Sequence, residues 1–225
     1  MKKFDFENYQ EKVSTAIELS AADFGSLSLS LRKITDQAEQ HLVESGEGDF
    51  GLIACRAGCA SCCVVNVSIL FPEGLAIAGY VQTLPLEQQS EIIERLDILW
   101  RAVRGLTDDE RIYLRQSCAF LDDSGSCRIY TVRPLLCRSV TSTSAKSCRQ
   151  ALTANLFGES SPVLMNLFQQ QLFESLYLGI GAGLENAGLE GRSAELTGLV
   201  RYLLQTPAAK AALFSGKRLD WHELA

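Results

Sequence analysis

Eight cysteines form two groups, and the rest of the 225-residue chain has none. The first group comprises Cys55, Cys59, Cys62 and Cys63, and the second comprises Cys118, Cys127, Cys137 and Cys148. Four thiols within nine residues are too close together to cross-link a fold, but their spacing suits one bound ion or cluster. Thiolates are soft ligands that select zinc, iron–sulfur clusters or copper(I) over magnesium and calcium. The chain has only two histidines, so a metal site must be dominated by sulfur.

Small residues separate the first-group cysteines and let the backbone fold around a centre: Ala57, Gly58, Ala60 and Ser61. Neighbouring side chains diverge, so Cys62 and Cys63 are expected either to serve different centres or to include one spare thiol. Buried free thiols and redox disulfides are the competing interpretations, and the clustering favours metal. A tetrahedral zinc or a cubane cluster needs only four of the eight cysteines, so participation of all eight is left open.

The charge and hydropathy of the chain argue against two classes of partner, nucleic acids and membranes. The formal net charge is −6, which argues against a nucleic-acid partner because no basic stripe is present to neutralise phosphates. The N-terminus has no apolar export signal, and no run of 18 apolar residues predicts a membrane span. We therefore expect a cytoplasmic protein with no membrane partner, in which thiols stay reduced and available to metal.

The expected fold is mainly α: a helical domain with cysteine-rich irregular loops forming a metal or Fe–S site, and at most short strands. One domain over residues 1–225 is predicted, with a cysteine-cluster core at 50–150 and flanking helices at 1–49 and 151–225. With 47% hydrophobic and 21% charged residues, the chain can build a core without disulfides.

Apolar residues at three- and four-residue steps predict helices over 9–24, 34–42 and 92–103. Thr107 to Glu110 matches a capping box that opens a short helix. Ser161-Pro162 is a predicted helix start, with an apolar face after it. Helices near residues 72–83 and 86–104 are expected to return the chain, so that the two cysteine groups meet.

Few segments of the sequence have a pattern that predicts a β-strand. Val65, Val67 and Ile69 alternate with polar residues, and residues 128–132 are a second short extended candidate. The glycine run at 178–183 is superficially similar to a methyltransferase loop. No strand is predicted before it, so a helix end or close helix packing is the preferred interpretation.

The two cysteine motifs together resemble a known family. The segment Cys55-x3-Cys59-x2-Cys62-Cys63 is similar to the signature of the YkgJ-like cysteine-cluster family, named for the pattern CxxCxxCC. The second segment, Cys118-Ala-Phe-Leu to Cys127-Arg-Ile-Tyr-Thr-Val-Arg-Pro-Leu-Leu-Cys137-Arg138, is similar to that family's second motif. Residues 71–78 resemble its acidic helix start, and the resemblance covers roughly residues 50–150.

The resemblance implies a zinc- or iron-chelating domain but not one reaction. The best-understood relatives are flagellin lysine N-methylases, which combine such a centre with S-adenosylmethionine. Two departures are present: the gap after Cys55 is three residues rather than two, and Ala119 replaces the usual proline.

These observations order the candidate ligands. Cys59, Cys62, Cys118 and Cys137 rank first, because the former pair has a two-residue gap and the latter pair anchors the second motif. Cys127 and Cys63 come next. Cys55 and Cys148 rank last, since one follows an irregular gap and the other lies beyond the recognisable block.

Three residues near the second group are predicted to contact a cofactor from behind the thiolates: Arg133, Arg138 and Tyr130. Salt-bridged surface arginines and core packing of the tyrosine are the alternatives, and the surface role is preferred for Arg128. His41 is interpreted as a residue at the edge of the core and His222 as exposed or locally packed, so neither is a predicted ligand.

The sequence thus favours a metal-binding protein that holds zinc, iron or an iron–sulfur cluster, such as 4Fe–4S. Two alternatives remain. One is a cluster-dependent enzyme that modifies a protein substrate with S-adenosylmethionine, and the other is a domain locked by a structural zinc. Neither catalytic residues nor an S-adenosylmethionine site can be identified from the residues.

Overall fold

A computed structural model describes residues 4–46, 52–220 and 224. It confirms a mainly helical fold with a single two-stranded sheet in the described part of the chain. In chain order the elements are α1 (Phe6–Ser20), α2 (Phe24–Ser45), β1 (Ser68–Ile69), α3 (Phe71–Gln82), α4 (Leu86–Val103), α5 (Asp108–Leu114), the 3-10 helix η1 (Tyr130–Val132), α6 (Leu135–Ser139), α7 (Ala145–Asn155), α8 (Leu167–Asn186), β2 (Ala194–Glu195), α9 (Leu196–Gln205) and α10 (Ala209–Phe214).

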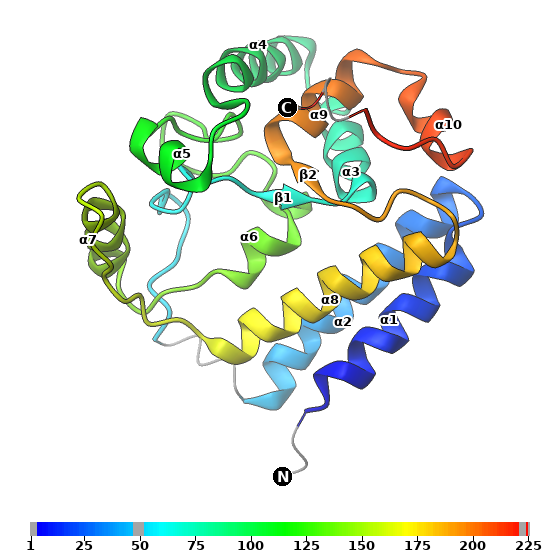
Figure 1. Ribbon diagram of the computed structural model, residues 1–225, viewed down its shortest axis with the longest axis horizontal. Helices are drawn as coiled ribbons and strands as arrows, with labels where there is room; N and C mark the ends of the chain where they lie inside the picture. Colours follow the sequence, from blue (N-terminus) through cyan, green and yellow to red (C-terminus); the bar gives the residue numbers. More distant parts are fainter. Residues whose placement is uncertain (1–3, 47–51, 221–223, 225) are drawn as a thin grey trace.

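Three long helices, α1, α2 and α8, lie side by side and form one layer (Figure 1). The contact between α1 and α8 depends on glycine. A Cβ atom at Gly183 would lie 2.4 Å from the carbonyl oxygen of Ser14, and one at Gly179 would lie 2.7 Å from that of Gln10. The glycine run is therefore part of α8 and serves close helix packing, as the sequence predicted.

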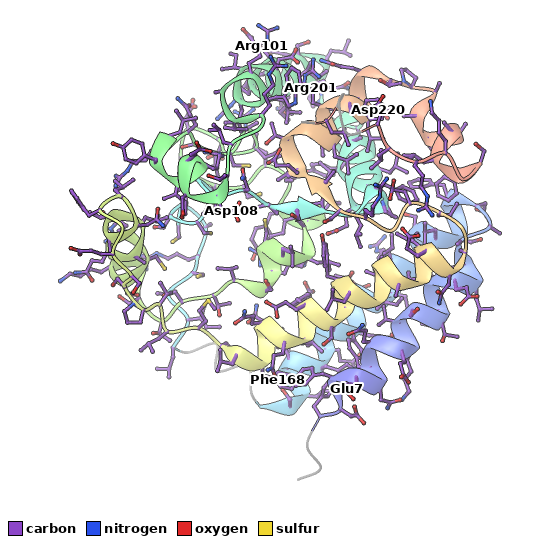
Figure 2. The ribbon with its side chains drawn as sticks, in the orientation of Figure 1. Glu7, Arg101, Asp108, Phe168, Arg201 and Asp220 are labelled. Carbon is purple, nitrogen blue, oxygen red and sulfur yellow. The ribbon has the colours of Figure 1, made fainter. Side chains whose placement is uncertain are left out.

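The second helical group is built around α9, which packs against both α3 and α4. Arg201 of α9 reaches α4, where its Nε donates to Oδ1 of Asp97 at 2.5 Å (Figure 2). Just before α9, β2 pairs antiparallel with β1, with Ser68 opposite Glu195 and Ile69 opposite Ala194. The short sheet thus connects the segment after the first cysteine group to the start of α9.

Local capping explains where several helices begin. The Thr107 hydroxyl accepts from the amide of Glu110, and the Glu110 carboxylate accepts from the amide of Thr107, which confirms the predicted capping box of α5. The predicted 9–24 stripe divides at residues 21–23. Asp23 accepts from the amide of Ser26 and so starts α2 rather than continuing α1.

Two local predictions are wrong. No helix starts at Ser161-Pro162, because the chain there is held in an extended form against residues 141–143. The amide of Thr143 donates to the carbonyl of Leu164 at 3.2 Å, and the helix begins only after Asn166 caps α8. Residues 130–132 form a 3-10 turn instead of a strand, so the extended candidate at 128–132 is also wrong. Of the 65–69 candidate, only Ser68 and Ile69 form a strand.

An aromatic cluster closes the end of the helix layer where α1 begins. Phe4 lies between the rings of Phe6, Phe168 and His41, with centroid distances of 4.9, 5.4 and 5.5 Å. Figure 2 shows Phe168 at the start of α8, close to the start of α1. His41 is thus a residue at the core edge, as predicted, while His222 lies outside the described residues. None of the helices in the described ranges is long and apolar enough to span a membrane.

Candidate metal centre

All eight cysteines line one cavity of about 300 Å³, and all eight are free thiols. The prediction that the two groups meet is therefore confirmed. Between the thiols, the wall is largely apolar and is formed by residues such as Val65, Val67, Leu99, Phe120 and Ile129. A cavity with this donor set and a largely apolar wall suits a soft metal centre.

Backbone hydrogen bonds hold the two cysteine segments against each other at both ends. The amide of Cys118 donates to the carbonyl of Cys63 at 2.8 Å. At the other end, the amide of Ala54 donates to the carbonyl of Ser142 at 2.8 Å. Because the segments are joined through main-chain groups, their thiols can face one cavity without any disulfide.

Two glycine turns lie back to back between these ends. Gly58 has φ +82° and Gly125 has φ +78°, a region of the backbone map that favours glycine. A Cβ atom at Gly125 would lie 3.3 Å from the carbonyl oxygen of Gly58, so the turns are in close contact. Asp122 fixes the second turn, since its Oδ1 accepts from the amides of Ser124 and Ser126. The cysteines next to these turns, Cys59 and Cys127, both line the cavity.

Four thiols form an inner group: Cys63, Cys118, Cys127 and Cys137. Burial raises the pKa of Cys118 to about 11 and also raises the pKa of Cys127 and Cys137. The charges of neighbouring thiols add to these shifts: Cys118 acts on Cys63 and Cys137, Cys127 acts on Cys118 and Cys137, and Cys62 acts on Cys127. Without metal these thiols are therefore held neutral, and ligation must release their protons.

Cys62 and Cys63 form a hydrogen-bonded pair. The bond raises the pKa of Cys63, the donor, and lowers the pKa of Cys62, the acceptor. The positive charge of Arg133 lowers the pKa of Cys62 further. Cys62 is thus the thiol of this pair that ionises first, and it is the more exposed of the two.

The remaining three thiols, Cys55, Cys59 and Cys148, form an outer group. Cys55 is exposed, and its Sγ lies 4.0 Å from the carbonyl oxygen of Ser142. Burial raises the pKa of Cys55, and the charges of Cys59, Cys62 and Cys148 add to this effect. Cys62 acts on thiols of both groups, so it lies between them.

The thiols line the cavity without converging on one point. Among the residues that the structure describes, no three Cys, His, Asp or Glu side chains form a group that could hold one metal ion.

The residues predicted to lie behind the thiolates occupy two different places. Arg133 and Tyr130 line the cavity, and the Arg133 guanidinium stacks over the Tyr130 ring at 4.7 Å from its centroid. Burial raises the pKa of Cys127 and Cys137, and the charge of Arg133 opposes this rise. Arg138 is not part of the cavity wall, because its guanidinium bonds to Glu39 and to the carbonyls of residues 131 and 133.

Arg128 has the surface role that the sequence favoured. Its two terminal nitrogens donate to the carboxylate oxygens of Glu91 at 2.6 and 2.8 Å. This bidentate pair ties the second cysteine segment to α4.

Three polar residues of the cavity were not anticipated from the sequence: Arg111, Gln169 and Glu195. They come from α5, α8 and β2. Arg111 and Gln169 are only 2% and 7% exposed. The capping box predicted α5 itself, but no apolar stripe indicated which face of so short a helix would be buried.

Comparison with known proteins gives one match. Residues 54–156 match the profile of the CxxCxxCC family, described as "Putative zinc- or iron-chelating domain". This segment contains all eight cysteines, so the match confirms the resemblance seen in the motifs. It supports metal binding in general without selecting the metal. Neither a curated protein nor a solved structure is detectably similar to the chain.

The residues present fit a thiolate-bound metal. Eight sulfur donors surround one cavity, and the cationic side chains of Arg111 and Arg133 are available to offset thiolate charge. Nη1 of Arg111 and Nε of Arg133 are buried and lack a hydrogen-bond partner among the described residues. Buried N–H groups without partners are rare, and a metal-bound sulfur is an acceptor that such groups can use.

Proposed function

We propose that this protein holds a polynuclear thiolate metal centre, with an iron–sulfur cluster as the first candidate, in the cavity between its two cysteine segments. The observation that carries the proposal is the placement of all eight cysteines around a single cavity of about 300 Å³. The family match supports the metal-binding part of this proposal.

Cavity size favours a cluster over a single zinc ion. Zinc lies about 2.3 Å from each thiolate sulfur, so four thiolates around one zinc enclose little more than the ion. The cavity has the volume of about ten water molecules. An iron–sulfur cluster brings its own sulfides and so reaches thiols that are spread around a larger space.

We further propose that the inner group supplies the first four ligands. Cys63, Cys118, Cys127 and Cys137 come from both cysteine segments, and burial contributes to the raised pKa of each. Cys62 and the outer group, Cys55, Cys59 and Cys148, then complete or cover the centre. Compared with the order expected from spacing, this raises Cys63 and Cys127 and lowers Cys59 and Cys62.

Zinc is the second candidate, because the eight thiols divide into sets that each suit a tetrahedral ion when Cys62 joins the outer group. The protein-modifying alternative gains no such observation. The glycine run at 178–183 lies inside α8, so it offers no S-adenosylmethionine loop. The protein substrate and the S-adenosylmethionine cofactor of this alternative stay predictions from the family resemblance.

Analysis of metal and acid-labile sulfide in anaerobically purified protein tests the proposal. Iron with a matching amount of sulfide, and the broad visible absorption of a cluster, is the expected result. Zinc at one or two ions per chain without sulfide would contradict the cluster but keep the metal centre. Protein that takes up neither metal during expression or reconstitution would overturn the proposed function.

Single cysteine variants test the ligand set. Cys118→Ala and Cys137→Ala should lose most of the bound metal, and Cys148→Ala should keep most of it. Alanine is preferred to serine because a serine hydroxyl in the buried part of the cavity would itself be destabilising. Far-ultraviolet circular dichroism of each variant separates loss of ligand from loss of fold.

A further inference from the structure

Arg111 is a buried cation without a direct counter-ion. Its side chain is 2% exposed and lines the cysteine cavity, and its Nη1 has no hydrogen-bond partner. Within the described residues its guanidinium forms no ion pair. An arginine guanidinium keeps its charge in proteins, so it cannot escape burial by losing a proton.

The position of Arg111 is fixed by the helix that carries it. α5 is held at its first turn by the capping box of Thr107 and by Asn66, whose Nδ2 donates to Oδ1 of Asp108 at 3.0 Å. Figure 2 shows Asp108 at the end of α5 that faces the segment before β1. α5 ends at Leu114, only four residues before Cys118, so the helix and this ligand candidate are placed together.

Two groups from outside α5 interact with the charge of Arg111, and neither neutralises that charge fully. Glu195 and Cys118 are the charges that favour its protonated form. The carboxylate of Glu195 is already used at the start of α9, where Oε2 accepts from the amides of Thr197 and Gly198 and Oε1 accepts from the hydroxyl of Thr197. Cys118 lines the same cavity but is not a hydrogen-bond partner of Nη1 of Arg111.

The acidic residues of α5 itself face other partners. Asp108 accepts from Asn66, Asp109 accepts from Asn155, and Glu110 accepts from Thr107. The first turn of the helix therefore contributes no carboxylate to the cavity side of Arg111. Nη1 of Arg111 lacks an acceptor on the wall that Cys118 shares.

We propose that Arg111 is the counter-charge of the metal centre, with its free Nη1 directed at the anionic metal–thiolate group on the Cys118 side of the cavity. This inference rests on the proposed function. Four thiolates around one divalent ion carry a net charge of about −2, so a loaded centre supplies the anion that Arg111 lacks. Arg111 then stabilises the loaded protein and destabilises the metal-free protein.

These opposite signs allow a sharp test. Arg111→Met keeps the length of the side chain and removes the charge, and Arg111→Lys keeps the charge. Arg201→Met is the matched control, because Arg201 is also largely buried but is paired with Asp97 and lies outside the cavity wall. Thermal unfolding is measured for each protein with its metal and after removal of the metal under reducing conditions. Competition with a chelator gives the metal affinity.

We expect Arg111→Met to raise the Tm of the metal-free protein and to lower that of the loaded protein, each by about 3 °C. Metal affinity should fall roughly 10- to 100-fold, the range for residues that support metal ligands. Arg111→Lys should recover part of this affinity. Arg201→Met should lower Tm equally in both states and leave metal affinity unchanged.

A metal-free Arg111→Met protein that melts below metal-free wild type would overturn the inference, since the guanidinium would then be fully satisfied by the fold. Equal Tm shifts in the metal-free and the loaded protein, or an unchanged metal affinity, would also overturn the inference. A wild-type protein that binds no metal would instead overturn the proposed function, and this inference with it.

Discussion

The helix layer of α1, α2 and α8 and the cysteine-bearing loops are held together by different kinds of contact. The layer packs through buried side chains and through glycines that bring two backbones together. The loops at residues 52–67 and 115–134 contain one 3-10 turn and no α-helix, and eight free thiols border the cavity between them and α6 and α7. Because apolar packing is independent of ligands, the layer should be stable without metal, while the loops depend on what the cavity holds.

Removal of the metal should produce the largest effect and should separate the two regions. Thiols that no longer share a metal cease to hold the loops together, so we expect Tm to fall by about 10 °C. Limited proteolysis should then cut within residues 52–67 or 122–126, and hydrogen exchange in α1 and α8 should stay slow. Equal Tm values for loaded and metal-free protein would show that the centre is peripheral to the fold.

Gly183→Ala should destabilise the helix layer and leave the cysteine-bearing loops unchanged. The added methyl group would lie 2.4 Å from the carbonyl oxygen of Ser14, so α1 and α8 must separate, and we expect a loss of about 1–3 kcal/mol of unfolding free energy. Metal content should stay unchanged. Urea unfolding measures the unfolding free energy, and metal analysis measures the metal content.

Gly79→Ala is the matched control in α3, where nothing lies within 4 Å of the added carbon. It should stabilise the protein by about 0.5–1 kcal/mol, because alanine is the better helix former. If Gly183→Ala also released the metal, the helix layer and the cavity would be coupled rather than separate.

The sequence predicted the helix layer better than the cavity, for a physical reason. Leu172, Leu176 and Ile180 repeat along α8 and are all buried, so periodicity identified both the helix and its inner face. The start of α8 was missed because residues 164–166 are held by long-range bonds to 141–143, which no local pattern reveals.

The cysteine motifs located the site, but not its internal arrangement. Spacing placed Cys59 and Cys62 together, whereas in the structure Cys62 neighbours Cys63 and Cys137 on one side and Cys55 on the other. Arg111 was not anticipated, because its burial depends on how α5 is set against β2 and Cys118. Contacts between segments far apart in the chain decide these features, and a single sequence does not encode them in any local pattern.

Glu73 joins α3 to α6 and should make stability depend on pH. Its carboxylate accepts from the amide of Leu70 at the start of α3 and from the amide of Leu135 at the start of α6. Burial raises the pKa of Glu73 from 4.5 to about 7, and the hydrogen bonds from the two backbone amides oppose this rise. A raised folded-state pKa means that the stabilising contribution is complete below about pH 4.5 and is lost as pH rises through about 7.

Urea unfolding of wild type and Glu73→Gln, both in the same metal state, isolates this contribution. The stability of wild type relative to Glu73→Gln should decrease between about pH 4.5 and about pH 7. A constant difference over this range would show that Glu73 does not titrate there.

The smallest expected effect comes from the ion pair that connects α2 to α6. Arg138 contacts Glu39 of α2, while the Arg138 side chain also donates to the carbonyls of residues 131 and 133, next to the cavity. Glu39 is 51% exposed, so solvent screens the pair and Glu39→Gln should lower the unfolding free energy by less than about 1 kcal/mol. Arg138→Met should have the larger effect, because it also leaves two backbone carbonyls without their donor and loosens the turn that leads to Cys137. Urea unfolding combined with metal retention distinguishes the two variants. A Glu39→Gln protein that loses metal as readily as Arg138→Met would show that the helix layer positions Cys137 through this pair, and the two regions would no longer be separable.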